Sequence, residues 1–176
     1  MRSPCAEERT ETGALRQIPD ARWSTAWHPR SVSLADDLAG ARYARMRWNT
    51  PLSEEHAALL LERLDVPPAG RVLDLGCGWG ELLLRAIETA SGSGTASVTG
   101  VGVDTDEVLL ARGRQLAAER SLQQQVTFVK QEAAAWREPA DRVMCIGASH
   151  AFGGTVTALK ALAELVRPGG RLLFGD

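Results

Sequence analysis

Short apolar runs alternate with longer segments of helical periodicity from residue 71 to the end of this 176-residue sequence. Runs rich in apolar and β-branched residues occur at 71–75, 98–104, 126–130, 142–146 and 171–174. Helical patterns lie between them at 81–89, 106–120 and 155–167, with a shorter one near 132–136. A rhythm of strand, helix and strand indicates parallel pairing through right-handed crossovers. The alternation therefore predicts an α/β fold, in which helices cover both faces of an open parallel sheet.

The chain before the first strand divides into two parts. Residues 1–20 are polar and show no periodicity, which predicts a disordered tail. Residues 21–66 contain four large aromatic side chains: Trp23, Trp27, Tyr43 and Trp48. Because these rings need an apolar surface, we expect the segment to form a helical lid or extension on a core domain at 67–176. The segment either only packs on the core domain or also lines a pocket there. Ser53 is the expected N-cap of the last helix in this segment.

Charge and hydropathy narrow the classes of partner. Basic and acidic side chains nearly cancel, the formal net charge is −2, and the arginines are dispersed. This balance predicts no binding to nucleic acid or to an anionic membrane, and it favours a small-molecule partner. No apolar run approaches the ~18 residues of a membrane span, and the N-terminus lacks the apolar core of a secretory signal. We therefore expect a cytoplasmic protein.

The three cysteines do not form a disulfide or metal-binding pattern. Cys5, Cys77 and Cys145 are far apart, and no histidine stands at ligand spacing from any of them. We expect reduced thiols and no bound metal.

A glycine-rich turn follows the first predicted strand. The residues Asp74-Leu75-Gly76-Cys77-Gly78-Trp79-Gly80-Glu81 place this turn between a strand and a helix. In an open parallel sheet, ligands bind in the crevice at the carboxyl ends of the strands. Glycines let the backbone pass close to such a ligand. The turn therefore predicts a site for a nucleotide-like molecule.

Further polar or small residues stand at the ends of the next three strands. Asp104 ends the second strand, where a carboxylate can accept hydrogen bonds from both hydroxyls of a ribose. Glu132 and Ala133 follow the third strand, where a side-chain acceptor and a backbone N–H would read an adenine edge. Gly147 ends the fourth strand and leaves space beside the ligand. These residues predict a nucleoside site along one edge of the sheet.

Residues 72–80, which read VLDLGCGWG, resemble the first motif of the class I S-adenosyl-L-methionine-dependent methyltransferases. The resemblance covers about residues 52–176. It implies a Rossmann-like open sheet of about five parallel strands in the order 3-2-1-4-5, with S-adenosyl-L-methionine as the cofactor.

The same resemblance implies roles for individual residues. Asp74 is expected near the methionine amino group, and Asp104 is expected to hold the ribose with Thr105 beside it. Glu132 falls where the family usually has Asp, so its longer side chain makes the implied adenine contact less direct. Three residues are expected to line the methionine and ribose with their backbones: Gly76, Cys77 and Gly78.

An alternative ligand is NAD or FAD. The dinucleotide fingerprint G-x-G-x-x-G/A requires a small residue where this chain has Glu81. A carboxylate there would repel a diphosphate, whereas S-adenosylmethionine has no phosphate and carries a cationic amine and sulfonium. The acidic loop therefore favours S-adenosylmethionine.

His150 is the candidate catalytic residue. Methyl transfer from a sulfonium is an in-line displacement, so the protein mainly aligns the acceptor and excludes water. If the nucleophile needs a general base, His150 stands just past the fourth strand, in a loop that the resemblance places over the transferable methyl. Ser149 would orient this histidine or the acceptor; alternatively, His150 only packs or caps the next helix. The chain is then either an active small-molecule methyltransferase or a domain that binds the cofactor without turnover.

The sequence stops directly after the fifth predicted strand, whereas the resembled family continues with a helix and two more strands. We therefore expect a C-terminally incomplete core in which residues 171–174 form an exposed sheet edge. Because unpaired edges recruit other strands, self-association and binding without efficient turnover are expected.

Overall fold

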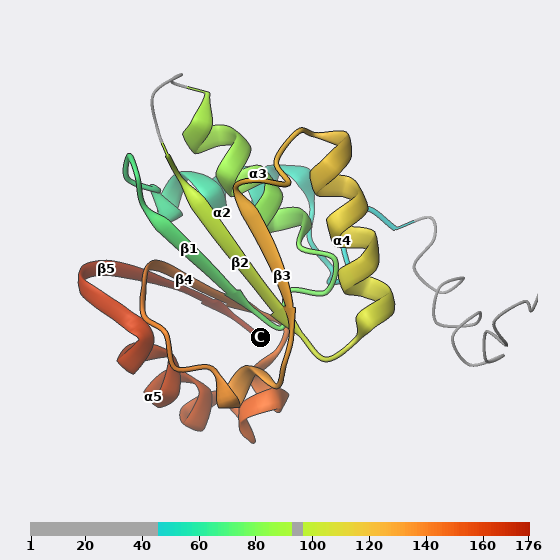
Figure 1. Cartoon of the computed structure of the whole chain (residues 1–176). Coiled ribbons are helices and arrows are strands. Elements are labelled where there is room, and N and C mark those ends of the chain that lie inside the picture. The colour runs from blue at the N-terminus through green and yellow to red at the C-terminus, as the bar shows by residue number, and fades with distance from the viewer. Residues whose placement is uncertain (1–45, 93–96) are drawn as a thin grey trace, which may run out of the picture. The chain divides into compact units, whose positions relative to one another are not determined.

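Residues 46–92 and 97–176 are described by a computed structural model of the chain (Figure 1). The expected tail at 1–20 and most of the expected lid, with Trp23, Trp27 and Tyr43, lie outside the described residues. None of the helices within the described ranges is long and apolar enough to cross a membrane.

Five parallel strands form one sheet in the order β3-β2-β1-β4-β5, which confirms the predicted fold class and strand order. The strands are β1 (Arg71–Leu75), β2 (Thr99–Asp104), β3 (Val126–Lys130), β4 (Ala140–Ile146) and β5 (Val166–Gly175). The direction of strand addition reverses between β1 and β4. In open α/β sheets, ligands bind at this reversal, outside the carboxyl ends of the strands.

Helices cover both faces of the sheet (Figure 1). One face carries α2 (Glu54–Leu64), α3 (Glu81–Ser91) and α4 (Glu107–Glu119). The other carries α5 (Thr155–Leu165) and the 3-10 helices η1 (Ala133–Ala135) and η2 (Ser149–Phe152).

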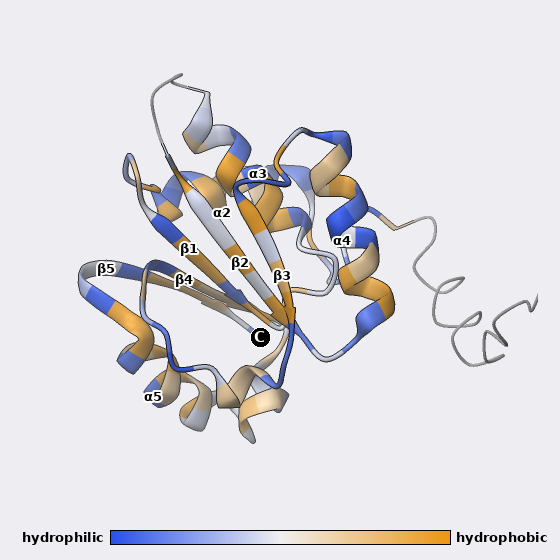
Figure 2. Ribbon diagram, viewed as in Figure 1, coloured by the Kyte–Doolittle hydropathy of each residue, from blue (hydrophilic) through white to orange (hydrophobic). Residues whose placement is uncertain are grey.

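Two apolar clusters fill the space between these layers and the sheet. Because successive side chains of a strand point to opposite faces, Val72 packs in the cluster below α3, whereas Leu73 and Leu75 pack in the cluster below α5. Figure 2 shows the corresponding distribution, with hydrophobic residues along the strands and hydrophilic residues on the outer turns of α4. The buried strands thus form a rigid base for the loops at their carboxyl ends.

β5 contains a bulge where the sequence predicts the end of a helix. The helix expected over 155–167 ends at Leu165, because Val166 is already extended and pairs with Ala140 of β4. Arg167, which precedes Pro168, is also disfavoured in the helical region. Pairing between β4 and β5 is interrupted over residues 167–170. A Cβ at Gly170 would lie 2.8 Å from two backbone carbonyl oxygens, so only glycine fits there without a shift.

A buried arginine of β4 anchors α2 to the sheet. The Arg142 residue is 7% exposed, and its guanidinium donates hydrogen bonds to the carbonyl of Leu64 at 2.6 Å and to that of Asp65 at 2.6 and 2.9 Å. Carbonyls at the end of a helix have no partner inside the helix. Arg142 therefore satisfies the end of α2 and fixes the helix relative to β4.

Candidate functional site

The loop after β1 is folded closely against its neighbours. The Gly76 N–H donates to the Val103 carbonyl at 2.9 Å. Gly76 and Gly78 adopt φ values of 76° and 57°, which favour glycine. A Cβ on Gly76 would collide with the Ala148 side chain, and one on Gly78 would collide with the Asn49 amide. The predicted close approach of the backbone therefore depends on glycine at both positions.

Asp104 is held at the end of β2 by two backbone donors. Its Oδ2 accepts the Gly78 N–H at 2.8 Å, and its Oδ1 accepts the Asp106 N–H at 3.0 Å. Since each carboxylate oxygen has two lone pairs, both oxygens keep acceptor capacity. The side chain is half-buried and is oriented before any ligand arrives.

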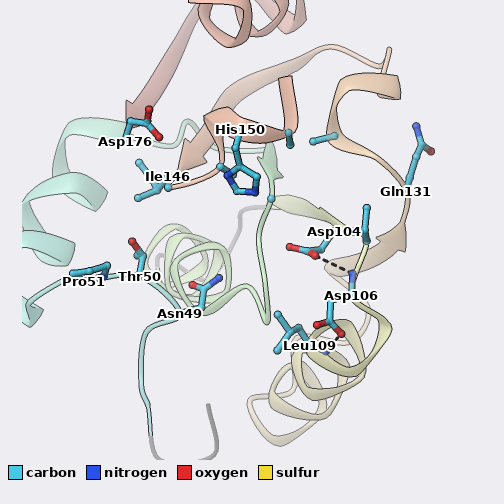
Figure 3. A pocket seen from close by; sticks show the side chains of 16 residues that line it. Asn49, Thr50, Pro51, Asp104, Asp106, Leu109, Gln131, Ile146, His150 and Asp176 are labelled. Carbon is cyan, nitrogen blue, oxygen red and sulfur yellow. Dashed lines mark hydrogen bonds between the residues drawn. The ribbon is translucent and has the colours of Figure 1, made fainter. Parts of the chain in front are cut away.

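A cavity of about 630 Å³ lies at the carboxyl ends of the strands. Six of the predicted site residues line it: Gly76, Asp104, Thr105, Ala133, Gly147 and His150. Figure 3 shows Asp104 and Gln131 on one side of this cavity, Ile146 and Asp176 on the other, and the His150 ring between them. The structure therefore brings residues from four strand ends around one cavity, which we call the main cavity.

The remaining predicted residues lie outside the lining of the main cavity. Asp74 and Cys77 line a smaller cavity of about 20 Å³ that shares Gly76 with the main one. Gly78 contributes its N–H to Asp104 and lines neither. Glu132 is exposed and also lines neither, whereas its neighbour Gln131 lines the main cavity.

The Asp74 carboxyl is buried near the end of β1. The residue is 5% exposed, and no hydrogen bond is among the causes that shift its pKa. Burial, reinforced by the negative charge of Asp104, raises the pKa of Asp74 to about 7. An ammonium group at this position would relieve both effects. The residues present therefore fit a ligand that carries a cation beside a ribose.

The C-terminal part of the segment expected as a lid covers the glycine-rich loop, although its individual residues were not among the predicted site residues. We call residues 46–52 the strap. Asn49, Thr50 and Pro51 of the strap line the main cavity. Of the four aromatic residues of the expected lid, only Trp48 lies in the described part of the chain, where it is buried. No local periodicity marks the strap, and Trp48 was the only signal for it in the sequence.

Backbone carbonyls and aromatic rings attach the strap to the core. The Trp79 Nε1–H donates to the Arg47 carbonyl at 3.2 Å, and the Arg112 guanidinium donates to the Met46 carbonyl at 2.9 Å. The same guanidinium lies 4.0 Å from the centroid of the Trp79 ring, within the range of a cation–π interaction. The strap is therefore fixed to α4 and to the loop after β1.

Asp176 is a second residue that the sequence reasoning missed. Its Oδ2 accepts hydrogen bonds from the Ser149 hydroxyl at 2.6 Å and from the Thr155 hydroxyl at 2.9 Å. These bonds hold the pKa of Asp176 below its ordinary value. Ser149 was expected to orient His150 or the acceptor; in the structure its hydroxyl donates to Asp176 instead. Asp176 thereby links the first residue of η2, the element that carries His150, to the first residue of α5.

Residues 72–170 match a family model described as a methyltransferase domain. The chain is 33% identical to the uncharacterized protein YjhP of Escherichia coli over 132 residues, which cover 74% of this chain and 51% of that protein. It is 29% identical to a hydroxymycolate synthase of Mycobacterium bovis over 141 residues, which cover 80% of this chain and 40% of the synthase. The chain thus spans about half or less of the length of these curated relatives.

A solved structure shows the same arrangement of elements. The S-adenosylmethionine-dependent methyltransferase of Geobacter sulfurreducens, crystallised with S-adenosyl-L-homocysteine, matches with a TM-score of 0.69 and 29% identity. The match covers 80% of this chain and 55% of that protein. Together with the family model, it confirms the resemblance seen in residues 72–80: the chain belongs to the methyltransferase domain family.

Proposed function

We propose that this chain binds S-adenosyl-L-methionine and transfers its methyl group to a small-molecule acceptor by in-line displacement. The observation that carries the proposal is the pair of carboxylates at the glycine-rich loop. Asp104 is held by two backbone donors and keeps acceptor capacity that would suit a ribose, and Asp74 is buried beside it, where a cation would offset its burial. This pair suits a nucleoside that carries positive charge and disfavours a diphosphate.

Each part of the cofactor has residues that fit it. Asp104 and Thr105 would accept and donate hydrogen bonds to the ribose hydroxyls, and Asp74 would attract the methionine ammonium. Ala133 and Gln131, which line the far side of the main cavity, would contact the adenine in place of the expected Glu132. When bound, the sulfonium supplies both the methyl group and the leaving group.

The acceptor side of the proposal rests on His150 and on the shape of the main cavity. His150 lies on η2 and lines the cavity between the Asp104 side and the Asp176 side (Figure 3). From there its imidazole would take the proton that an acceptor hydroxyl or amine releases on methylation. Gly147 and Gly76, which present no side chain, leave room for the acceptor to reach the cofactor.

Methyl transfer to an unidentified acceptor tests the proposal. The chain is incubated with methyl-labelled S-adenosylmethionine and a bacterial extract that has been divided into small molecules and macromolecules. The proposal expects label in the small-molecule fraction with the native chain and none with heat-denatured protein. Label confined to the macromolecular fraction contradicts a small-molecule acceptor. Binding of the cofactor without any labelled product supports the alternative, a binding domain without turnover.

A further inference from the structure

A second large cavity adjoins the main one. Its volume is about 470 Å³, and it lies between α2, the strap and the carboxyl end of β5. Five residues line both cavities: Thr50, Pro51, Ile146, Gly147 and Asp176. Figure 3 shows four of them, Thr50, Pro51, Ile146 and Asp176, on the side of the main cavity that is opposite Asp104 and Gln131. The second cavity therefore adjoins the main cavity on the side opposite Asp104.

The walls of this second cavity are mainly apolar. Leu52, Leu60 and Phe174 line it together with Pro51 and Ile146. Its volume falls in the range of pockets that hold a drug-sized molecule, roughly 300–1,000 Å³. Such walls stabilise the bound state of an apolar body by removing its surface from water.

The polar groups of the second cavity carry no fixed positive charge. Among the described residues that line it, none is Lys or Arg, and the only carboxylate is that of Asp176. His56 and Thr50 provide hydrogen-bonding groups. An anionic group buried here would lose its hydration without gaining a charged partner, and the Asp176 carboxylate would repel it.

We infer that the second cavity holds the methyl acceptor, and that the acceptor is an uncharged, mostly apolar molecule with one nucleophilic hydroxyl or amine. This inference rests on the proposed function. The apolar body occupies the space between Leu60 and Phe174, and the nucleophilic group points past Ile146 toward His150. The acceptor atom forms a bond to the methyl carbon as the sulfonium bond breaks, and the proton of the acceptor passes to the imidazole.

Two probes that share one ring system test the charge preference. Equilibrium dialysis measures the binding of 2-naphthol, which is neutral at pH 7, and of 2-naphthyl phosphate, with the full chain saturated by S-adenosyl-L-homocysteine. We expect 2-naphthol to bind and the phosphate ester to bind at least about tenfold more weakly. Equal or tighter binding of the ester overturns the inference.

Two adjacent leucines of α2 provide a matched pair of variants. Leu60 lines the second cavity, whereas Leu59 is 46% exposed and does not. Leu60→Trp should fill the cavity and weaken 2-naphthol binding at least about tenfold, and Leu59→Trp should leave it unchanged. His56→Trp is the second blocking variant, since His56 is exposed and the larger ring there does not disturb the core.

Binding of S-adenosyl-L-homocysteine distinguishes failure of the proposed function from failure of the inference about the acceptor. All three variants should retain the dissociation constant of the native chain for S-adenosyl-L-homocysteine. If neither the native chain nor the variants bind it, the proposed function is wrong. If they bind it but Leu60→Trp and His56→Trp leave 2-naphthol binding unchanged, the acceptor does not occupy this cavity and the inference is wrong.

Discussion

Asp74 is a carboxyl group whose protonation should influence both stability and binding. Its pKa in the folded chain is about 7, against an ordinary value of 3.8, because it is buried and lies beside the negative charge of Asp104. Between pH 3.8 and pH 7, Asp74 is therefore protonated in the folded state and ionised in the unfolded state. The stability from this proton is complete below about pH 4 and is lost as the pH rises through 7.

The stability of Asp74→Asn relative to the native chain isolates this effect. Because one pH unit corresponds to about 1.4 kcal/mol, the variant should gain up to roughly 4 kcal/mol over the native chain between pH 4 and pH 8. Urea unfolding across this range measures the difference. A difference that does not change with pH would show that Asp74 is ionised throughout.

His150 is the residue on which turnover is expected to depend. Its ring lines the main cavity, and η2, which carries it, is tied to Asp176 by Ser149. With an acceptor in hand, His150→Ala should lower kcat by roughly a hundredfold or more while the dissociation constant for S-adenosyl-L-homocysteine stays unchanged. Equal kcat values for the variant and the native chain would assign His150 a structural role.

At the scale of elements, Arg142 anchors the C-terminal end of α2 to β4. Its guanidinium satisfies the last carbonyls of α2, and no shorter side chain would reach them from β4. Arg142→Met should lower the free energy of unfolding by about 2–4 kcal/mol, because hydrogen bonds to a charged group are lost and carbonyls remain buried. Chemical denaturation provides the measurement.

Arg167→Met is the control for this change. Arg167 forms an ion pair with Asp141 at 3.1 Å, and its side chain is 42% exposed. Such surface pairs contribute about 0–1 kcal/mol, so this variant should resemble the native chain. Equal destabilisation by both variants would mean that Arg142 acts only through its charge.

The elements that follow local rules could be predicted from the sequence. Ser53 caps α2 and Asp106 caps α4, as their side chains allow, and the β-branched run at 126–130 forms β3. The strand order was also predicted, but through the resemblance carried by residues 72–80 rather than through the pattern alone.

Contacts between distant parts of the chain could not be predicted. The Asn49 amide lies against Gly78, and Asp176 binds Ser149, which stands 27 residues earlier. These pairs are defined only when the strands have been brought together, since no periodicity or motif relates their positions. For the same reason, the cavity between α2 and β5 could not be predicted from the sequence.

At the scale of the whole molecule, the described sheet has two outer strands, β3 and β5. β5 lies at one end of the described sheet and pairs there with β4 alone. Leu172 and Phe174 of this strand are only half-buried. Because an unpaired strand edge accepts another strand, we expect the weight-average mass in sedimentation to rise with protein concentration.

Hydrogen exchange identifies the surface that associates. Amide protons of β5 should become more protected as the concentration rises, whereas those of the exposed face of α4 should not. A constant mass over a hundredfold range of concentration would show that the edge is closed. Association without protection in β5 would place the contact elsewhere.

Calorimetric titration with S-adenosyl-L-homocysteine and with NAD tests the central proposal most directly. We expect the native chain to bind S-adenosyl-L-homocysteine and not NAD. Asp104→Asn should weaken binding by about ten- to a hundredfold, because hydrogen bonds to its charged carboxylate are lost, and Glu107→Gln, an exposed change nearby, should have no effect. Thermal unfolding without ligand verifies that both variants are folded. Binding of NAD without S-adenosyl-L-homocysteine, or an unchanged dissociation constant for Asp104→Asn, would contradict the proposed site.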